Sequence, residues 1–481
     1  MNLFIDRDEE LNFLNQHYAQ TKAQFIVIYG RRRVGKSELV KQFIKDKEAI
    51  YFLPTKTTAP HHLQRFLEKI AFYFKEYTPQ INSWEDGFKY FRQKIDSPQK
   101  LVLVIDEFPY LLEANPEIPS LFQLFWDEYL KDKNIFLILL GSSISMMEAE
   151  VLSQKSPLYG RRTGQIRLLP FHFKDAALFY PSLSIEKVIE FYAVVGNIPL
   201  YLLEFDQDKS LIQNIQDKIL AQKELLYEET HFLLKEELRD PATYQAILEA
   251  IAFNTTATEI AHKAQVELHN LDKYLKVLLK LDLIYKETPV TIEKPKSRKV
   301  NYYLKDNFFS FWYRFCFPNQ SLLEENPGLL LNQIIQPQLN SYIGRKFEQV
   351  CKEYLWHQNR AGKAPFSFTK LGREWGKIPE AADDKNQYEI DLCAINPKNK
   401  EILFGECKWQ TEVDPVAQLY LLRNKAVAVG WNKGQRKEYF ILFAKSFQDK
   451  SKVNKEAMNC SLIDLQDLEA GSRKEQVRWV G

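Results

Sequence analysis

Short apolar runs alternate with longer amphipathic stretches through about the first 170 residues of the chain. The clearest runs are Phe25–Tyr29, Leu101–Ile105 and Ile135–Leu140, and Ala49–Leu53 is a fourth. Runs that are apolar on both faces and separated by helical segments are typical of a parallel sheet covered by helices. Residues 1–170 are therefore predicted to form an α/β domain.

The pattern becomes helical after this domain. Residues 171–240 are rich in Leu, Tyr and Glu and lack strand signals, which predicts a helical lid. Within residues 241–310, Tyr244–Phe253 is predicted as one helix, and Thr256-Ala-Thr-Glu259 is a capping-box pattern that begins a second. Leu271–Leu281 has a single apolar stripe, so we expect a third helix there.

The segment that follows these helices, residues 286–299, resembles a β-hairpin wing with a basic tip. Helices followed by a wing form a shape that docks on DNA, with the third helix in the major groove. Lys273, Lys276 and Lys280 lie largely off the apolar stripe of that helix. On the wing, Lys296, Arg298 and Lys299 are expected to meet DNA phosphates. The same shape also serves as a packing module, and the sequence leaves both interpretations of this winged helix open.

A second mixed region closes the chain. The aromatic and then Pro/Asn-rich segment Phe308–Pro337 indicates a domain boundary, so residues 335–481 are predicted as a separate α/β domain. Its expected elements are a helix near Ser341–His357, strands around Glu389–Ile395 and Glu401–Trp409, a helix near Val416–Lys425 and a strand at Tyr439–Ala444.

Composition excludes several classes of protein. Lys plus Arg is 65 and Asp plus Glu is 63, so the net charge is +2 and any basic surface must be local. The five cysteines are scattered and include no CxxC pair, which argues against a disulfide framework or a zinc ribbon. No apolar run approaches the roughly 18 residues of a membrane span, and acidic residues near the N-terminus do not resemble a signal peptide. We expect a cytoplasmic protein without a membrane partner.

The apolar run Phe25–Tyr29 leads directly into Gly30-Arg31-Arg32-Arg33-Val34-Gly35-Lys36-Ser37, which fits GxxxxGK[ST]. A strand, a glycine-rich turn and a helix are the setting of a phosphate-binding loop. Gly30 and Gly35 let backbone N–H groups curl around phosphates, and the helix N-terminus adds positive potential. Lys36 is then expected to contact the β- and γ-phosphates, and the Ser37 hydroxyl to ligate Mg²⁺.

A second buried run, Leu101–Ile105, ends in Asp106 and Glu107. A strand that ends in two carboxylates beside a phosphate-binding loop can place one near the metal and one near water. Asp106 is therefore predicted to help hold Mg²⁺, and Glu107 to be the general base for hydrolysis.

Four further segments resemble motifs of a known family. They are Phe4–Leu11, which contains Arg7; Gly141–Ser143, which contains Ser142; Tyr159–Gly164, which carries Arg161 and Arg162; and Gly196–Leu202, which contains Pro199. Together with the two Walker elements they resemble the AAA+/STAND class and, more narrowly, the DEXX-box ATPase family of archaea and bacteria. The resemblance implies ATP and Mg²⁺ as cofactors, Arg7 near the adenine, Ser142 in the sensor 1 segment and Pro199 in the lid motif.

The arginine pair leaves two interpretations open. On chemistry alone, Arg161 or Arg162 could offer a planar cation to a γ-phosphate, and Arg161 is the candidate catalytic residue. A surface pair without such a role is the alternative. An arginine that acts across a subunit contact would make activity depend on a homo-oligomer.

Carboxylates and a lysine recur in the C-terminal region. Asp391 lies on an alternating strand, where Asp391 and Cys393 are expected to share one face, with Ile390 and Leu392 on the other. After a polar turn, Glu406 and Lys408 share a face of the returning strand. Glu348, on the helix Ser341–His357, is expected to reach the same pocket.

This set has a chemical rationale. Asp391 and Glu406 can jointly hold Mg²⁺ through oxygen ligands, which lowers the pKa of a bound water. Lys408 can position that water or neutralise a developing oxyanion. The string D-x(14)-E-x-K resembles the PD-(D/E)xK nuclease superfamily, and restriction-endonuclease-like C-terminal regions also occur in the DEXX-box ATPase family.

The function expected from the sequence is an Mg²⁺-dependent ATPase that binds DNA and cleaves it at the C-terminal site. The alternative is an ATP-gated DNA-binding switch in which Glu348, Asp391, Glu406 and Lys408 break no phosphodiester bond.

Overall fold

The structure is a computed structural model that describes residues 4–95, 99–238, 240–293, 299–378, 387–454 and 459–473. The described chain divides into two compact units, Met1–Phe171 and His172–Gly481. None of its described helices combines the length and the apolar character needed to cross a membrane. Lys296 and Arg298, at the expected wing tip, lie outside the described residues.

The first unit is built on a parallel sheet with the strand order β2-β3-β4-β1-β5. Its strands are β1 (Gln24–Tyr29), β2 (Ala49–Phe52), β3 (Leu101–Ile105), β4 (Ile135–Gly141) and β5 (Gly164–Arg167). β1, β3 and β4 are buried along their whole length, which confirms the parallel sheet expected from the apolar runs. β5 contains only one buried residue, Ile166, and its sequence gave no such signal.

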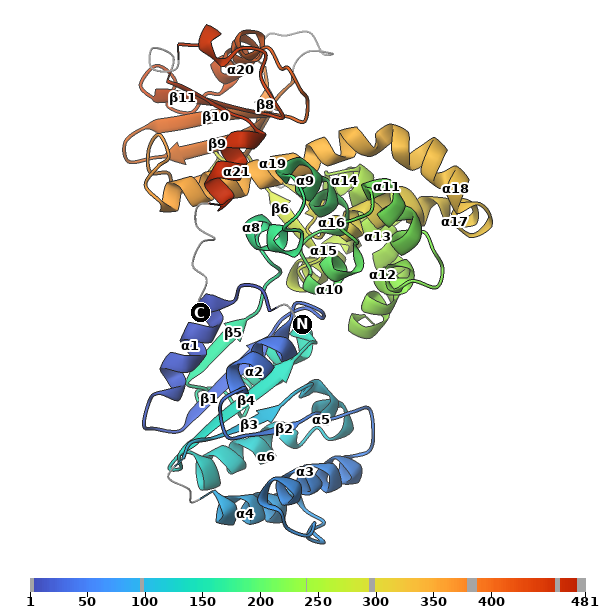
Figure 1. Ribbon diagram of the computed structural model, residues 1–481, viewed down its shortest axis with the longest axis vertical. Coiled ribbons are helices and arrows are strands. Elements are labelled where there is room, and N and C mark those ends of the chain that lie inside the picture. Colours follow the sequence, from blue (N-terminus) through green and yellow to red (C-terminus); the bar gives the residue numbers. More distant parts are fainter. Residues whose placement is uncertain are drawn as a thin grey trace. The chain divides into compact units, whose positions relative to one another are not determined.

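Helices cover both faces of this sheet (Figure 1). On one face lie α1 (Asp8–Tyr18) and α2 (Lys36–Ile44), where the rings of Phe43 and Phe136 are 5.3 Å apart. The opposite face packs against α3 (Ala59–Phe74), α4 (Trp84–Lys94), α5 (Pro109–Ala114), α6 (Ile118–Leu124) and the π-helix η1 (Phe125–Leu130). Two shorter segments, α7 (Ile144–Met146) and η2 (Met147–Leu152), follow β4.

The second unit begins with helices. They are α8 (Phe173–Ala176), η3 (Ala177–Phe179), α9 (Ile185–Val195), α10 (Pro199–Glu204), α11 (Leu211–Asn214), η4 (Ile215–Ile219) and α12 (Leu225–Glu237). Next come α13 (Pro241–Phe253), α14 (Ala257–Lys263) and α15 (Leu268–Lys280), followed by the antiparallel pair β6 (Ile284–Glu287) and β7 (Asn301–Leu304). Thr256 and Glu259 form the predicted capping box, and α15 buries Leu271, Leu275 and Leu278 in its stripe.

A helical segment then leads to a mixed sheet. The connecting helices are α16 (Asn307–Phe311), η6 (Trp312–Cys316), η7 (Phe317–Asn319), α17 (Gln320–Glu325), α18 (Pro327–Leu330), η8 (Leu331–Ile335) and α19 (Gln336–Arg360). The sheet and its helices comprise β8 (Lys370–Lys377), β9 (Gln387–Asn396), β10 (Glu401–Lys408), α20 (Pro415–Ala428), β11 (Lys437–Ala444), η9 (Lys450–Lys452), β12 (Cys460–Ile463) and α21 (Leu465–Arg473). The strand order is β12-β11-β10-β9-β8, with β9 antiparallel to both neighbours and β11 parallel to both.

The expected alternation along β9 is wrong at residues 390–393. The pairing of β8 with β9 shifts register between Gly372 and Glu374. Ile390 and Cys393 therefore pack in the same hydrophobic cluster, although strict alternation would put them on opposite faces. The irregularity lies beside Asp391, which is half-buried at this point of the strand.

The segment after β6 does not project as a free wing over its described part. The Val290 N–H donates to the Arg373 carbonyl of β8 at 3.1 Å, and the Val290 side chain belongs to the core of the mixed sheet. The Thr291 N–H and hydroxyl donate to the Glu374 carboxylate at 3.0 and 2.9 Å. We call residues 287–292 the docking segment, because they fasten the β6–β7 pair to β8.

Candidate functional site

The loop between β1 and α2 has the geometry of a phosphate-binding loop. Gly35 has φ 93°, in the left-handed region that favours glycine, and Arg33 has φ 68°. A Cβ at Gly30 would lie 2.3 Å from the Leu168 carbonyl oxygen, so this position has no room for a side chain. The Lys36 ammonium donates to the carbonyls of Gly30 and Arg31 at 2.9 and 3.0 Å, which keeps it inside the loop.

Asp106 directly follows β3 and contacts Ser37, which follows this loop. Its Oδ2 accepts hydrogen bonds from the Ser37 hydroxyl at 2.7 Å and from the Tyr51 hydroxyl. Its Oδ1 accepts from the Glu107 N–H at 2.8 Å. Both carboxylate oxygens are thus fixed by donors, and the predicted pair Ser37 and Asp106 is in direct contact.

Glu107 and Ser142 also meet. The Ser142 hydroxyl, at the end of β4, donates to Glu107 Oε2 at 2.5 Å. Glu107 itself has φ 46°, in the left-handed region that is uncommon for a residue other than glycine. The carboxyl ends of β1, β3 and β4 therefore bring together the residues that the Walker elements and the sensor segment predicted.

Arg7 braces the loop from the N-terminal segment. Its guanidinium donates to the carbonyls of Val34 at 3.1 Å and Leu169 at 2.8 Å, and it lies 4.3 Å from the centre of the Phe171 ring. Arg7 is 7% exposed, so burial and these contacts hold it in place.

The described contacts of Arg161 do not include this group. Arg161 pairs with Asp127 at 2.7 and 2.9 Å and donates to the Pro157 carbonyl at 2.7 Å. These contacts favour the alternative in which the arginine pair lies at the surface without a role at the γ-phosphate, because they hold the guanidinium against neighbouring residues. Pro199 begins α10 in the second unit.

In the second unit, Asp391 and Glu406 meet where β9 and β10 part. Asp391 Oδ2 accepts from the Cys407 N–H at 2.9 Å. Glu406 is buried, and its carboxylate contacts the Lys408 ammonium at 3.0 Å and the Lys425 ammonium of α20 at 2.6 Å.

Glu348 reaches this group from α19. It pairs with Arg373 of β8, which also pairs with Glu389 at 2.9 Å. Arg373 Nε is 3.7 Å from a carboxylate oxygen of Glu287, so the docking segment shares the same arginine.

The charges of these carboxyl groups affect one another's pKa. Burial raises the pKa of Glu348 to about 8 against the lowering effect of Arg373, and the charge of Asp391 adds to the rise. Burial and then the charge of Glu406 raise the pKa of Asp391 to about 6. Burial alone would lower the pKa of Lys408, but Glu406 and Asp391 raise it. The predicted quartet is therefore one electrostatic cluster.

The sequence did not indicate three residues of the phosphate-binding site and the C-terminal cluster: Tyr51, Arg373 and Lys425. Tyr51 could have been found, because the carboxyl ends of neighbouring parallel strands lie together and Tyr51 is near the end of β2. The place of Arg373 in the cluster depends on how β8 pairs, and that of Lys425 on how α20 is rotated. The sequence carries no local signal for either.

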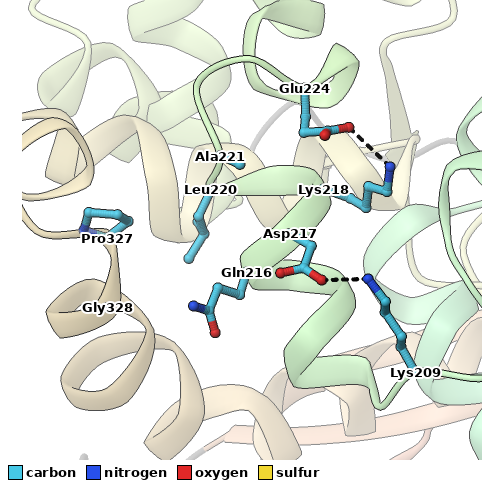
Figure 2. A pocket seen from close by; sticks show the side chains of 9 residues that line it. All are labelled: Lys209, Gln216, Asp217, Lys218, Leu220, Ala221, Glu224, Pro327 and Gly328. Carbon is cyan, nitrogen blue, oxygen red and sulfur yellow. Dashed lines mark hydrogen bonds and ion pairs between the residues drawn. The ribbon is translucent and has the colours of Figure 1, made fainter.

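A cavity of about 510 Å³ lies elsewhere in the second unit (Figure 2). Its charged side chains form pairs, Lys209 with Asp217 at 2.8 Å and Lys218 with Glu224 at 3.1 Å. None of the residues predicted to carry chemistry lines it.

A half-buried cation beside the C-terminal cluster, Lys346, gives a stability prediction. Burial lowers the pKa of Lys346 to about 8, and its ammonium donates to the Ser310 hydroxyl at 2.9 Å. The unfolded chain binds more protons between about pH 8 and its ordinary value, so stability rises with pH across that window. Lys346→Met should raise Tm by about 2–4 °C at pH 7, and the gain should shrink above pH 8. Thermal unfolding at both pH values tests this, and a gain independent of pH would contradict the charge argument.

The parallel sheet, the glycine loop after β1 and the acidic end of β3 define the class: this is a P-loop ATPase. Residues 4–205 match the family model described as an ATPase domain predominantly from Archaea. Residues 312–420 match a model described as archaeal and bacterial proteins of unknown function. An uncharacterized protein of Methanocaldococcus jannaschii is 39% identical over 470 residues, which cover 97% of this chain and 100% of that protein. The chain therefore belongs to the same protein family as this relative, and its ATPase domain is the part at residues 4–205.

Other similarities are more limited. An uncharacterized ATP-binding protein of Methanocaldococcus jannaschii is 48% identical over 46 residues, which cover 10% of this chain and 78% of that protein. Among solved structures, the Walker-type ATPase of Pyrococcus abyssi has a TM-score of 0.49 and 19% identity, covering 65% of this chain and 96% of that chain.

Proposed function

We propose that this ATPase depends on Mg²⁺, binds DNA and cuts it at the C-terminal carboxylates. The observation that carries the DNA-cutting part is the convergence of Glu348, Asp391, Glu406 and Lys408 from α19, β9 and β10. The negative charges of Asp391 and Glu406, which raise the pKa of Asp391, favour a cation between them.

At the P-loop, Ser37 and Asp106 would hold the metal, because their oxygens already lie 2.7 Å apart at the phosphate-binding loop. Mg²⁺ would neutralise charge on the β- and γ-phosphates. Lys36 would leave the Gly30 and Arg31 carbonyls and contact those phosphates. Glu107, oriented by Ser142, would accept a proton from the attacking water.

Glu107→Gln is expected to keep ATP binding and lose hydrolysis. The amide leaves Ser37 and Asp106 unchanged but cannot accept the proton, so turnover should fall roughly 10²-fold or more. Nucleotide affinity and phosphate release measured on the same preparation test this. Turnover at the wild-type rate would mean that another residue activates water.

Arg161 remains a candidate cation for the γ-phosphate. Its use would require the pair with Asp127 to open. Pro199, at the start of α10, would belong to the nucleotide site through the lid of residues 171–240, because the family resemblance places it in the lid motif. A homo-oligomer would be needed if Arg161 acts on a neighbouring subunit.

The C-terminal donor set fits a divalent cation. Asp391 and Glu406 are close enough for the charge of Glu406 to raise the pKa of Asp391, and a cation between them would relieve this repulsion. Across the described residues, no cluster of three or more His, Cys, Asp or Glu forms a metal site. Mg²⁺ is commonly bound by one or two carboxylates, and water molecules complete its coordination shell. Asp391 and Glu406 would supply the two carboxylates. Lys408 would stabilise charge on the scissile phosphate.

Helices α13–α15 and the β6–β7 pair support DNA binding by a winged helix in residues 241–310. Lys273, Lys276 and Lys280 are exposed on α15, although Lys276 pairs with Asp272 at 2.6 Å. The proposed division is an ATPase domain at 1–170, a lid at 171–240, the winged helix at 241–310 and a restriction-endonuclease-like domain at 335–481.

One observation favours the non-cleaving alternative, an ATP-gated DNA-binding switch. Glu348 already pairs with Arg373, and Glu406 already contacts two lysines. Carboxylates that are already paired with cations, as Glu348 and Glu406 are, can hold a fold together without binding metal.

The deciding experiment incubates the full chain with supercoiled plasmid, linear duplex and single-stranded DNA. Each DNA is tested with Mg²⁺ or Mn²⁺, with and without ATP. Nicking or linearisation supports cleavage. DNA binding that responds to ATP, without cleavage under any condition, supports the switch.

A further inference from the structure

Tyr51 occupies an unusual position beside the P-loop. It lies on β2 between Ile50 and Phe52, whose side chains belong to the hydrophobic core. Because side chains alternate along a strand, Tyr51 faces the opposite side of the sheet, where α2 begins. Its hydroxyl donates to Asp106 Oδ2, the same oxygen that accepts from Ser37.

The Tyr51 hydroxyl can act only as a donor to this carboxylate. A phenol carries its proton at neutral pH and an ionised carboxylate can only accept, so the hydrogen bond runs from Tyr51 to Asp106. Ser37 has to turn an oxygen lone pair toward a cation when one binds. Tyr51 does not ligate the cation, so its hydrogen bond to the Asp106 carboxylate can persist before and after the cation binds.

We propose that Tyr51 is a positioning residue of the ATPase reaction, whose hydroxyl holds Asp106 in the orientation that receives the Mg²⁺ bound to ATP. The proposal rests on the Mg²⁺ dependence proposed above. It assigns to β2 a part of the nucleotide site that the Walker elements do not contain. Tyr51 touches neither the nucleotide phosphates nor the attacking water in this role, because it acts through Asp106.

The test compares Tyr51→Phe with a matched control, Tyr73→Phe. Tyr73 also donates to a carboxylate, that of Glu48 at 2.5 Å, but it lies on α3 at the surface. Both substitutions keep the ring and remove one hydroxyl. Binding of a fluorescent ATP analogue is measured in EDTA and across an Mg²⁺ titration, with thermal unfolding of each variant.

Tyr51→Phe is expected to raise the half-saturating Mg²⁺ concentration roughly tenfold, as for loss of a hydrogen bond to a charged group. Affinity in EDTA should stay within about twofold of wild type, and Tyr73→Phe should match wild type throughout. In an Asp106→Asn background, Tyr51→Phe should add no further change, because the residue acts through that carboxylate.

Two outcomes would overturn the inference alone: an unchanged Mg²⁺ titration for Tyr51→Phe, or an equal loss of affinity in EDTA and Mg²⁺. The second would show a structural role. A wild-type protein whose nucleotide affinity does not respond to Mg²⁺ would overturn the metal assignment itself, and the inference with it.

Discussion

Lys36→Ala should abolish tight ATP binding and, with it, hydrolysis. The Lys36 ammonium lies inside the loop, within hydrogen-bond distance of the Gly30 and Arg31 carbonyls, and it is 6% exposed. Without it the β- and γ-phosphates lose their buried counter-charge, so affinity should fall roughly 10²-fold or more. Equilibrium binding of labelled ATP measures the loss.

Lys41→Ala is the matched control for this substitution. Lys41 lies on the same helix, but its side chain is 58% exposed and pairs with Glu38 at the surface. It should bind ATP as the wild type does. Wild-type affinity in a folded Lys36→Ala protein would refute the assignment of the loop.

Asp391→Asn and Glu406→Gln should each remove DNA cleavage and leave ATP hydrolysis largely intact. Asn can still accept the Cys407 N–H, so the strand end keeps its shape, but a neutral amide is a poor Mg²⁺ ligand. Cleavage should fall roughly 10²-fold or more if the metal activates the water. The ATPase residues lie in the other unit and should be unaffected.

Plasmid cleavage by the wild type and these variants is compared with that of Glu438→Ala. Glu438 is a carboxylate on β11 that pairs with Arg436 at 2.8 Å. The Glu438→Ala variant should cleave the plasmid as the wild type does. Equal cleavage by wild type and Asp391→Asn would point to a contaminating nuclease or a wrong site.

The P-loop could be predicted because its information is contiguous. Gly30, Gly35, Lys36 and Ser37 follow a single strand, and Asp106 directly follows another. That Ser37 and Asp106 lie near each other then follows from the parallel arrangement, because both strands end at the same edge of the sheet.

The C-terminal cluster could be predicted only in part. Asp391, Glu406 and Lys408 lie on a hairpin, where spacing predicts proximity. The irregular pairing at Gly372 and Glu374 could not be foreseen, since it depends on a strand that the pattern did not reveal. Arg373 was missed for the same reason.

The docking segment has a consequence for chimaeric proteins. Val290 and Thr291 precede the sequence boundary near residue 335, yet they complete the core and satisfy Glu374 in the sheet that follows it. A chimaera that took only the residues from 335 onward would leave Glu374 without the Thr291 donors and Arg373 without Glu287. Residues 284–304 must therefore be included when that sheet is fused to another ATPase.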